Sequence, residues 1–192
     1  MKIATLRAWF TLSKPLTHVL GILPFSLGGV LAWNLTGSFD WAVFGLGIFG
    51  ALLLMLVACY SGEYFDFETD TLAIPFRNRF SGGSQVLQKT DTIEPIHSLI
   101  AAFVCLILAG IIGVLLQFHF KTGPLTIPLG ILAMIAAFFY SAKPIQWAYI
   151  GLGEIWIWLA YGWLSVATPF YLLTGGFVPV VHWASLPIAF TI

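Results

Sequence analysis

A cluster of acidic residues follows an uncharged apolar run of this 192-residue chain. Four of its eight acidic residues lie within residues 59–70, directly after the run 41–57: Glu63, Asp66, Glu68 and Asp70. On a helix, where successive residues are about 100° apart, Glu63, Asp66 and Asp70 fall within about 60° of one another, and Glu68 points away. We therefore expect three carboxylates to converge where a membrane helix meets water.

Converging carboxylates suit a divalent cation. Like charges about 6 Å apart repel by roughly 3 kcal/mol at an effective dielectric of ~20. Ligands that are all oxygens favour a hard ion, and Mg²⁺ usually takes one or two carboxylates together with substrate phosphates. The pattern predicts Asp66 and Asp70 as Mg²⁺ ligands, with Glu63 supporting them or binding through water. The alternative is a solvated helix end that binds no ion.

Basic residues near this cluster suit a diphosphate. Arg77 and Arg79 follow the acidic helix after a short loop, and arginine binds phosphate oxygens in a bidentate manner. Lys14 and Lys143 are weaker candidates for the same role, since all four residues could instead reflect the usual charge bias of membrane loops. The stretch 81–84 (SGGS) either turns backbone N–H groups toward a phosphate or acts as a flexible linker.

The composition shows which elements must position these residues. The chain is 59% hydrophobic and only 8% charged, whereas a soluble domain carries about 25% charged residues. It is therefore expected to be an all-α, polytopic transmembrane helical bundle, with residues 1–192 forming a single membrane domain. Its net charge is zero, so nucleic acid is not an expected partner, and its two cysteines provide no disulfide framework.

Hydropathy predicts about five complete spans and a partial sixth. Residues 1–14 resemble a short interfacial helix, and the next apolar run is longer than the core of a signal peptide. The expected spans are 16–35, 41–60, 96–118, 125–140 and 155–173, and the last apolar segment begins near residue 180.

The basic residues predict how these spans are oriented. Alternating spans place the N-terminus and the loops 61–95 and 141–153 on one side of the bilayer. That side then holds seven of the eight basic residues, and only Lys121 lies on the other. The excess of lysine and arginine in cytoplasmic loops predicts an integral protein of the cell or inner membrane whose acidic motif faces the cytoplasm.

Five stretches, in register along essentially the whole chain, resemble the UbiA-type superfamily of intramembrane prenyltransferases. Asp66 and Asp70 match both aspartates of the family motif NxxxDxxxD, although Gly62 replaces its asparagine. The stretch 14–17 (KPLT), followed by Pro24, is similar to the signature of the first helix. The stretches 63–66 (EYFD) with 79–84 (RFSGGS), 140–144, and 149–154 (YIGLGE) resemble the branch that prenylates dihydroxynaphthoate for menaquinone, although Ile150 stands at a position that is often basic there.

The resemblance implies a nine-helix bundle with a central cavity, of which this chain supplies the first part. A prenyl diphosphate would be held through Mg²⁺ by two aspartate-rich motifs, with its polyprenyl tail lying among the helices. Departure of the diphosphate would leave an allylic cation, which an electron-rich aromatic acceptor attacks. Asp66 and Asp70 would bind Mg²⁺ with help from Glu63, and the basic residues would contact the diphosphate, namely Arg77, Arg79, Lys14 and Lys143.

Three other functions are possible. A UbiA-type enzyme could use a different acceptor, such as hydroxybenzoate. A non-enzymatic transporter or scaffold is disfavoured, because a transporter needs polar residues near the midplane of several spans, whereas here all basic residues but Lys121 lie on one face. Alcohol phosphatidyltransferases also use aspartates and magnesium, but their DGxxAR-type signature is absent.

The end of the sequence predicts that a longer chain exists. The apolar segment from about Val180 has some 13 residues, short of the ~20 needed to cross a bilayer. The family's second aspartate-rich motif would belong just after this segment, and with one motif a diphosphate keeps half of its magnesium sites. We therefore expect the 192-residue chain to be inactive alone.

Overall fold

The computed structural model describes residues 2–76, 83–90 and 92–191, and this part of the chain contains helices and no strand. Its α-helices are α1 (Lys2–Leu12), α2 (Val19–Thr36), α3 (Trp41–Phe65), α4 (Phe67–Leu72), α5 (Val86–Lys89), α6 (Pro95–Val114), α7 (Thr126–Phe139), α8 (Gly153–Ile157), α9 (Ser165–Thr174) and α10 (Pro179–Ala189). Two short 3₁₀ helices are η1 (Pro15–His18) and η2 (Ile74–Phe76), and two π-helical segments are η3 (Leu115–His119) and η4 (Trp158–Leu164).

Four helical stretches are long and apolar enough to cross a membrane. They are Ile3–Thr36, Trp41–Phe65, Pro95–His119 and Gly153–Thr174, and Thr126–Phe139 is a shorter apolar helix. Together with α10, these segments coincide with the spans predicted from hydropathy. Their outer faces expose large apolar side chains, for example Trp33, Ile107 and Phe118, as expected for helices that face lipid. The fold class predicted from the sequence is confirmed: a polytopic helical bundle.

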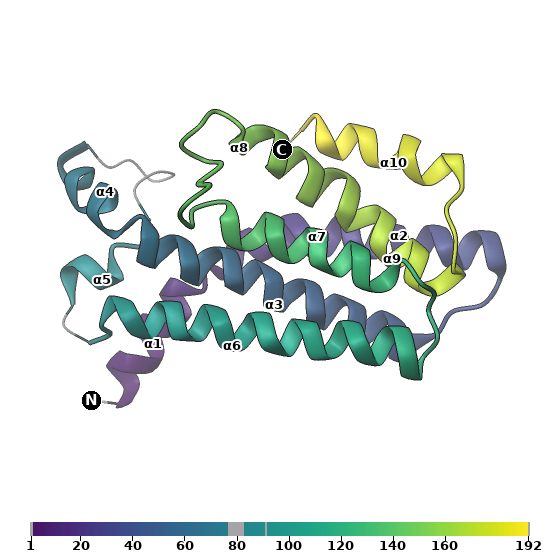
Figure 1. Ribbon diagram of the computed structural model, residues 1–192, viewed down its shortest axis with the longest axis horizontal. Coiled ribbons are helices and arrows are strands. Elements are labelled where there is room, and N and C mark those ends of the chain that lie inside the picture. Colours follow the sequence, from purple (N-terminus) through teal and green to yellow (C-terminus); the bar gives the residue numbers. More distant parts are fainter. Residues whose placement is uncertain (1, 77–82, 91, 192) are drawn as a thin grey trace.

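The helices run side by side along the long axis of the molecule (Figure 1). Helix α3 is central, since it packs against α2, α6, α7 and α9. Helix α2 packs mainly against α9, and α10 lies against η4 and α9. One buried core, around Phe25, Val57 and Ile112, joins α2, α3 and α6.

Close helix contacts depend on glycine at two positions. A Cβ at Gly28 would overlap the backbone carbonyl of Val166, so only glycine permits this approach of α2 to α9. A Cβ at Gly162 would come 2.5 Å from the Cβ of Ala189, so α10 also lies close to η4. Small residues thus allow dense packing where apolar side chains gain little from leaving lipid.

The sequence explains where α3 begins and ends. The carboxylate of Asp40 caps its first turn by accepting hydrogen bonds from the N–H groups of Ala42 and Val43, at 2.9 and 3.0 Å. At 1.5 Å per residue the 25 residues of α3 span about 37 Å, more than the ~30 Å of a hydrocarbon core. Helix α3 is therefore longer than an apolar layer, and its polar C-terminal turn carries Glu63, with Asp66 directly after it.

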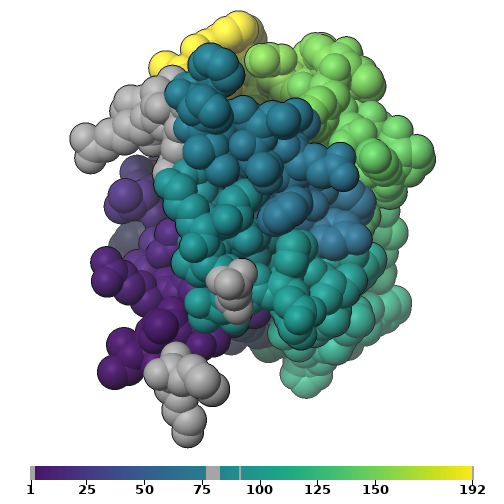
Figure 2. Space-filling model, turned by 90° about the vertical axis from the view of Figure 1, so that its left-hand side faces the viewer, coloured from purple at the N-terminus to yellow at the C-terminus, as the bar shows by residue number. Residues whose placement is uncertain are grey.

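One end of the bundle gathers polar segments that are distant in sequence. The C-terminal turn of α3, α4, α5 and the segment 140–152 lie together at the left of Figure 1. Figure 2 views this end, where the blue residues of α3 and α4 adjoin the green residues of the segment 140–152. Lys121 lies at the opposite end, next to a turn where Leu125 N–H donates to Tyr171 OH at 3.0 Å. The loops expected on one side of the membrane thus do share one end of the molecule.

Candidate functional site

Asp66 is the polar centre of this end. It is the residue at which α3 stops and α4 begins. Its Oδ2 accepts a hydrogen bond from Ser141 Oγ at 2.8 Å, and its Oδ1 accepts one from Tyr149 OH at 2.7 Å. Both donors come from the segment that links α7 to α8, so this segment is fixed to the end of α3 through one carboxylate.

The charge of Asp66 is only partly compensated. Burial raises the pKa of this carboxyl above its usual range, although the hydrogen bonds from Tyr149 and Ser141 oppose the shift. Both hydroxyls are neutral, and within residues 2–76, 83–90 and 92–191 Asp66 forms no ion pair. A bound cation would therefore stabilise the charged form of Asp66.

Asp70 lies one helical turn beyond Asp66. Its N–H donates to the Asp66 carbonyl at 2.7 Å, so the helical path continues through the break between α3 and α4. Between them, Thr69 Oγ1 lies 2.9 Å from Tyr149 OH. A Cβ at Gly83, which has a φ of +62°, would overlap Asp70 Oδ2. The second glycine of the Gly-rich stretch is thus required both by its backbone conformation and by the contact with Asp70.

Glu63 turns toward a different set of partners. Its side chain is fully buried, and Oε1 forms an ion pair with Lys14 Nζ at 2.8 Å. Oε1 also accepts from Ser84 N–H at 2.8 Å, and Oε2 accepts from Ser84 Oγ at 2.7 Å. One carboxylate therefore joins α3 to the residue before η1 and to the end of the Gly-rich stretch, which is anchored here rather than free as a linker would be.

A site with three carboxylate ligands is not preformed. In the part of the chain that the structure describes, no three aspartate, glutamate, histidine or cysteine side chains lie close enough to hold one metal ion. The charge of Glu63 is already paired with Lys14, and the expected convergence of Glu63 with Asp66 and Asp70 on one ion is not seen among the described residues. Asp66 and Asp70 still fit Mg²⁺, because this ion commonly takes two carboxylates and completes its shell with phosphate oxygens and water.

The remaining predicted residues lie in several places. Glu68 is exposed, in agreement with its expected position off the acidic face. Lys143 is exposed on the segment that also carries Ser141. Arg77 and Arg79 lie outside the described residues, so their expected contacts with a diphosphate stay predictions.

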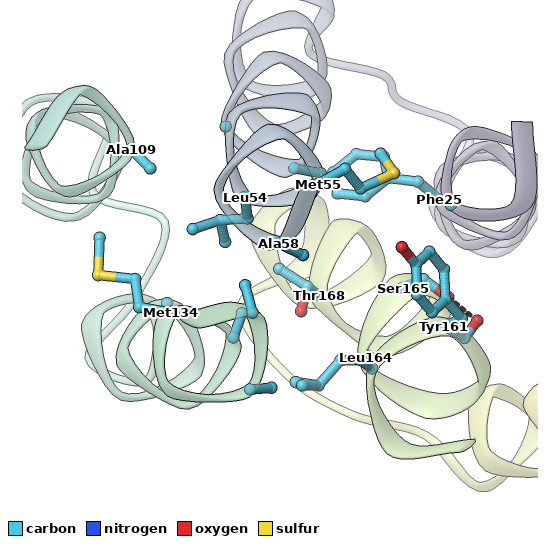
Figure 3. A pocket seen from close by; sticks show the side chains of 18 of the residues that line it. Phe25, Leu54, Met55, Ala58, Ala109, Met134, Tyr161, Leu164, Ser165 and Thr168 are labelled. Carbon is cyan, nitrogen blue, oxygen red and sulfur yellow. Dashed lines mark hydrogen bonds between the residues drawn. The ribbon is translucent and has the colours of Figure 1, made fainter. Parts of the chain in front are cut away.

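A cavity of about 580 Å³ opens beside Asp66 and runs between the helices. Figure 3 shows side chains that border it, with Phe25 on α2, Ala109 on α6, Met134 on α7, and further residues on α3, η4 and α9 (Leu54, Met55, Ala58, Tyr161, Leu164, Ser165 and Thr168). Its size lies within the usual range of small-molecule sites, roughly 300–1,000 Å³.

The cavity is polar at one end and apolar along the rest of its length. Lys14 and Asp66 are its only charged lining residues among those described, and Tyr140 and Ser141 lie beside them. Farther along, its wall is formed largely by aliphatic side chains and glycines of α3, α6 and α7. The π-helical segment η4 contributes Tyr161 and Leu164, and π-helical turns are frequent at functional sites. The arrangement suits a long apolar molecule with a charged head.

Three residues that hold the carboxylates could not be predicted from the sequence. Ser141 and Tyr149 bind Asp66, and Ser84 binds Glu63. Each falls within a stretch that resembles the menaquinone branch, so the family pattern marked the regions. The pairing itself had no signal in one sequence, because Asp66 is separated from Ser141 by 75 positions and from Tyr149 by 83.

The sequence is similar to known proteins over most of its length. Residues 22–192 match the UbiA prenyltransferase family. The chain is 26% identical over 170 residues to a 2-carboxy-1,4-naphthoquinone phytyltransferase of Synechocystis sp., an alignment covering 88% of this chain and 52% of the relative. It is 29% identical over 186 residues to a 1,4-dihydroxy-2-naphthoate octaprenyltransferase of Escherichia coli, covering 94% of this chain and 58% of the relative.

No solved structure matches the chain. The chain spans about half the length of the curated relatives it matches. The family match covers most of the 192 residues, including Asp66 and Asp70. The chain belongs to the UbiA prenyltransferase family.

Proposed function

We propose that the protein transfers a polyprenyl group from a prenyl diphosphate to an aromatic acceptor in the membrane, in a Mg²⁺-dependent reaction. The observation that carries this proposal is the cavity, whose charged lining residues, among those described, lie at the end beside Asp66 and whose wall is largely apolar over the rest of its length. A prenyl diphosphate has the same distribution of polarity, with a charged head and a long hydrocarbon tail. The cavity therefore suits the donor as a whole.

The diphosphate would lie at the polar end. Asp66 and Asp70 would hold Mg²⁺, which supplies positive charge to the departing diphosphate. Lys14 lines the cavity at this end, and its ammonium group would attract the same phosphates. Arg77, Arg79 and Lys143 are proposed as further diphosphate contacts. Tyr149 and Ser141 orient Asp66 through neutral hydrogen bonds, so they hold the carboxylate in place without cancelling its charge.

The proposed reaction needs a site in which an allylic cation is shielded from water. When the bond between carbon and the diphosphate oxygen breaks, the positive charge is left on the prenyl group, and water would capture it. The apolar wall excludes water, and Tyr140, Trp156 and Tyr161 line the cavity near its polar end. Aromatic rings stabilise a nearby cation through their negative faces. An electron-rich carbon of the acceptor then forms the new bond, and the ring loses a proton.

A bicyclic naphthoate is the proposed acceptor. Both relatives reported above are named for naphthalene-type substrates, and the names of the two differ in the prenyl group transferred. A dihydroxynaphthoate in menaquinone or quinone biosynthesis is therefore favoured over hydroxybenzoate. We further propose that the end of the bundle carrying Asp66 faces the cytoplasm, because seven of the eight basic residues belong to segments on that side.

Prenyl transfer in membranes of cells that express the protein from its natural coding sequence tests this proposal. Dihydroxynaphthoate and hydroxybenzoate would be offered side by side with one prenyl diphosphate, with Mg²⁺ and after its removal by a chelator. We expect prenylated naphthoate only when Mg²⁺ is present. Turnover of hydroxybenzoate alone would reassign the acceptor, and the absence of any prenylated product would contradict the proposed activity.

A further inference from the structure

The end of the cavity that lies away from Asp66 is bordered by glycines on three helices. They are Gly50 on α3, Gly113 on α6 and Gly130 on α7. At 1.5 Å per residue, about 24 Å of helix separates Gly50 from Asp66. A prenyl tail whose diphosphate lies at Asp66 would reach these glycines only when it is long.

Two of these glycines leave space that a side chain could fill. A Cβ at Gly113 or at Gly130 would meet no atom within 4 Å, and both residues line the cavity. At Gly50 a Cβ would lie 3.4 Å from Ile112 Cγ2, an ordinary contact. The absence of side chains at Gly113 and Gly130 therefore adds open volume to the cavity and is not required for helix packing.

Other glycines of the cavity wall serve packing instead. A Cβ at Gly21 would come 2.6 Å from Met55 Sδ, and one at Gly47 would come 2.9 Å from Leu172 Cδ1. Larger residues at Gly21 and Gly47 would displace neighbouring helices and disturb the bundle as a whole. Gly113 and Gly130 are different, because a larger residue there would take up space meant for a ligand.

We infer that Gly113 and Gly130 determine the longest prenyl tail that the protein accepts. This inference rests on the proposed function. Each further prenyl unit carries the tail deeper between α3, α6 and α7, and the two glycines leave room where those helices border the far end of the cavity. A side chain at either position would exclude the end of a long tail and leave a short tail untouched.

The test is the ratio of activity with a long donor to activity with a short one. Gly113→Leu and Gly130→Leu would be assayed in membranes with octaprenyl diphosphate and with geranyl diphosphate, using the acceptor turned over by the wild-type protein. A hydrophobic site discriminates by roughly 10–200-fold for a change of one methylene. We therefore expect the ratio of kcat/KM values to fall by about 10-fold or more, with most of the loss on the long donor.

Gly45→Leu is the matched control. Gly45 lies on α3, its Cβ would also meet no atom within 4 Å, and it is exposed on the outside of the bundle, away from the cavity. Its ratio should equal that of the wild type. Partial misfolding of a variant cancels in the ratio, because both donors are measured on one preparation. Gly130→Ala adds a single methyl group and should shift the ratio in the same direction by less.

The outcomes separate this inference from the proposed function. An unchanged ratio in both leucine variants, or an equal loss with both donors, overturns the role of the glycines while prenyl transfer by the wild type still stands. If the wild type transfers no prenyl group from either donor, it is the proposed function that fails. A ratio that falls equally in Gly45→Leu would also count against the inference, because the effect would then not depend on the cavity.

Discussion

At the scale of single residues, Glu63 and Asp66, both at the C-terminal end of α3, have different surroundings. Glu63 is fully buried against a lysine, whereas among the described residues the side chain of Asp66 is bound by two neutral hydroxyl groups. A carboxylate that is already paired with a cation has little to gain from a metal ion. Asp66 is therefore better suited than Glu63 to the proposed metal site, and Glu63 is better described as the residue that holds Lys14 and Ser84 in place.

Neutralising the proposed metal ligands should abolish activity. In Asp66→Asn and Asp70→Asn the side chains keep their shape but lose the charge that attracts Mg²⁺. We expect prenyl transfer to fall on the order of 100-fold or more, together with Mg²⁺-dependent binding of the donor. Glu68→Gln is the matched control, because Glu68 is exposed on the same short helix. An equal loss in Glu68→Gln would contradict the assignment.

Removing one partner of the buried ion pair should destabilise the protein more than removing both partners together. Lys14→Met leaves Glu63 charged and buried, and removing one partner of a buried pair costs about 3 kcal/mol or more. The Lys14 side chain is 34% exposed, so solvent screening places the cost at the lower end. The measurement is thermal unfolding of the purified protein in detergent.

The double variant Lys14→Met with Glu63→Gln measures how strongly the two residues are coupled. It should be more stable than the sum of the two single variants predicts, because it leaves no unpaired charge in the protein. Arg7→Met provides the control, since Arg7 is exposed on α1. Strict additivity of the two single variants would show that Lys14 and Glu63 are not coupled.

The acidic motif shows how far a single sequence predicts a site. Its helical periodicity correctly placed Glu68 on the outside, because that depends only on neighbours within two turns. The fate of Glu63 could not be predicted in this way. Its partners lie 49 positions earlier, at Lys14, and 21 later, at Ser84, and they meet only when the helices pack.

At the scale of helices, spans were predictable and their contacts were not. Apolar run length located α2, α3, α6, α7 and the helix from α8 to α9, because crossing a hydrocarbon layer requires it. Glycines on a membrane span, such as Gly113 on the third one, are typical sites of close helix approach. Gly113 instead borders the cavity, and the closest backbone approach is made by Gly28 on α2. Composition identifies small residues but not which of them face a helix.

The contact between α2 and α9 provides a test at this scale. Gly28→Ala places a methyl group against the backbone carbonyl of Val166, so one helix must shift. Overpacking of this kind usually costs 1–3 kcal/mol, and we expect a loss of about that size. Thermal stability in detergent measures it. Gly45→Ala is the control and should be neutral or stabilising, because alanine favours helix more than glycine does.

At the scale of the whole molecule, the charges divide the bundle into two unlike ends. The ion pair of Lys14 with Glu63 and the hydrogen bonds of Asp66 bring the N-terminal segment, the end of α3, Ser84 and the segment 140–152 to one end. The turn around Lys121 lies at the other. Single-sequence counting of basic residues therefore grouped the loops correctly, because the number of spans decides which loops share a side.

Cysteine labelling tests which side each end faces. In a background with Cys59 and Cys105 replaced by alanine, Lys89→Cys and Pro124→Cys would each introduce one exposed thiol, at opposite ends of the bundle. A membrane-impermeant maleimide should label Pro124→Cys in intact cells and Lys89→Cys only after the membrane is opened. Labelling of both from the same side would refute the orientation.

The placement of charge along the cavity also has a consequence for how the proposed donor would reach it from the bilayer. Since only Lys14 and Asp66 among the described lining residues are charged, and both lie at one end, the proposed donor would enter tail first from the leaflet next to that end. Its diphosphate would then never enter the hydrocarbon, where even one charged side chain costs about 3 kcal/mol. In the proposed reaction the prenylated ring would form in that same leaflet, so neither substrate would have to cross the bilayer.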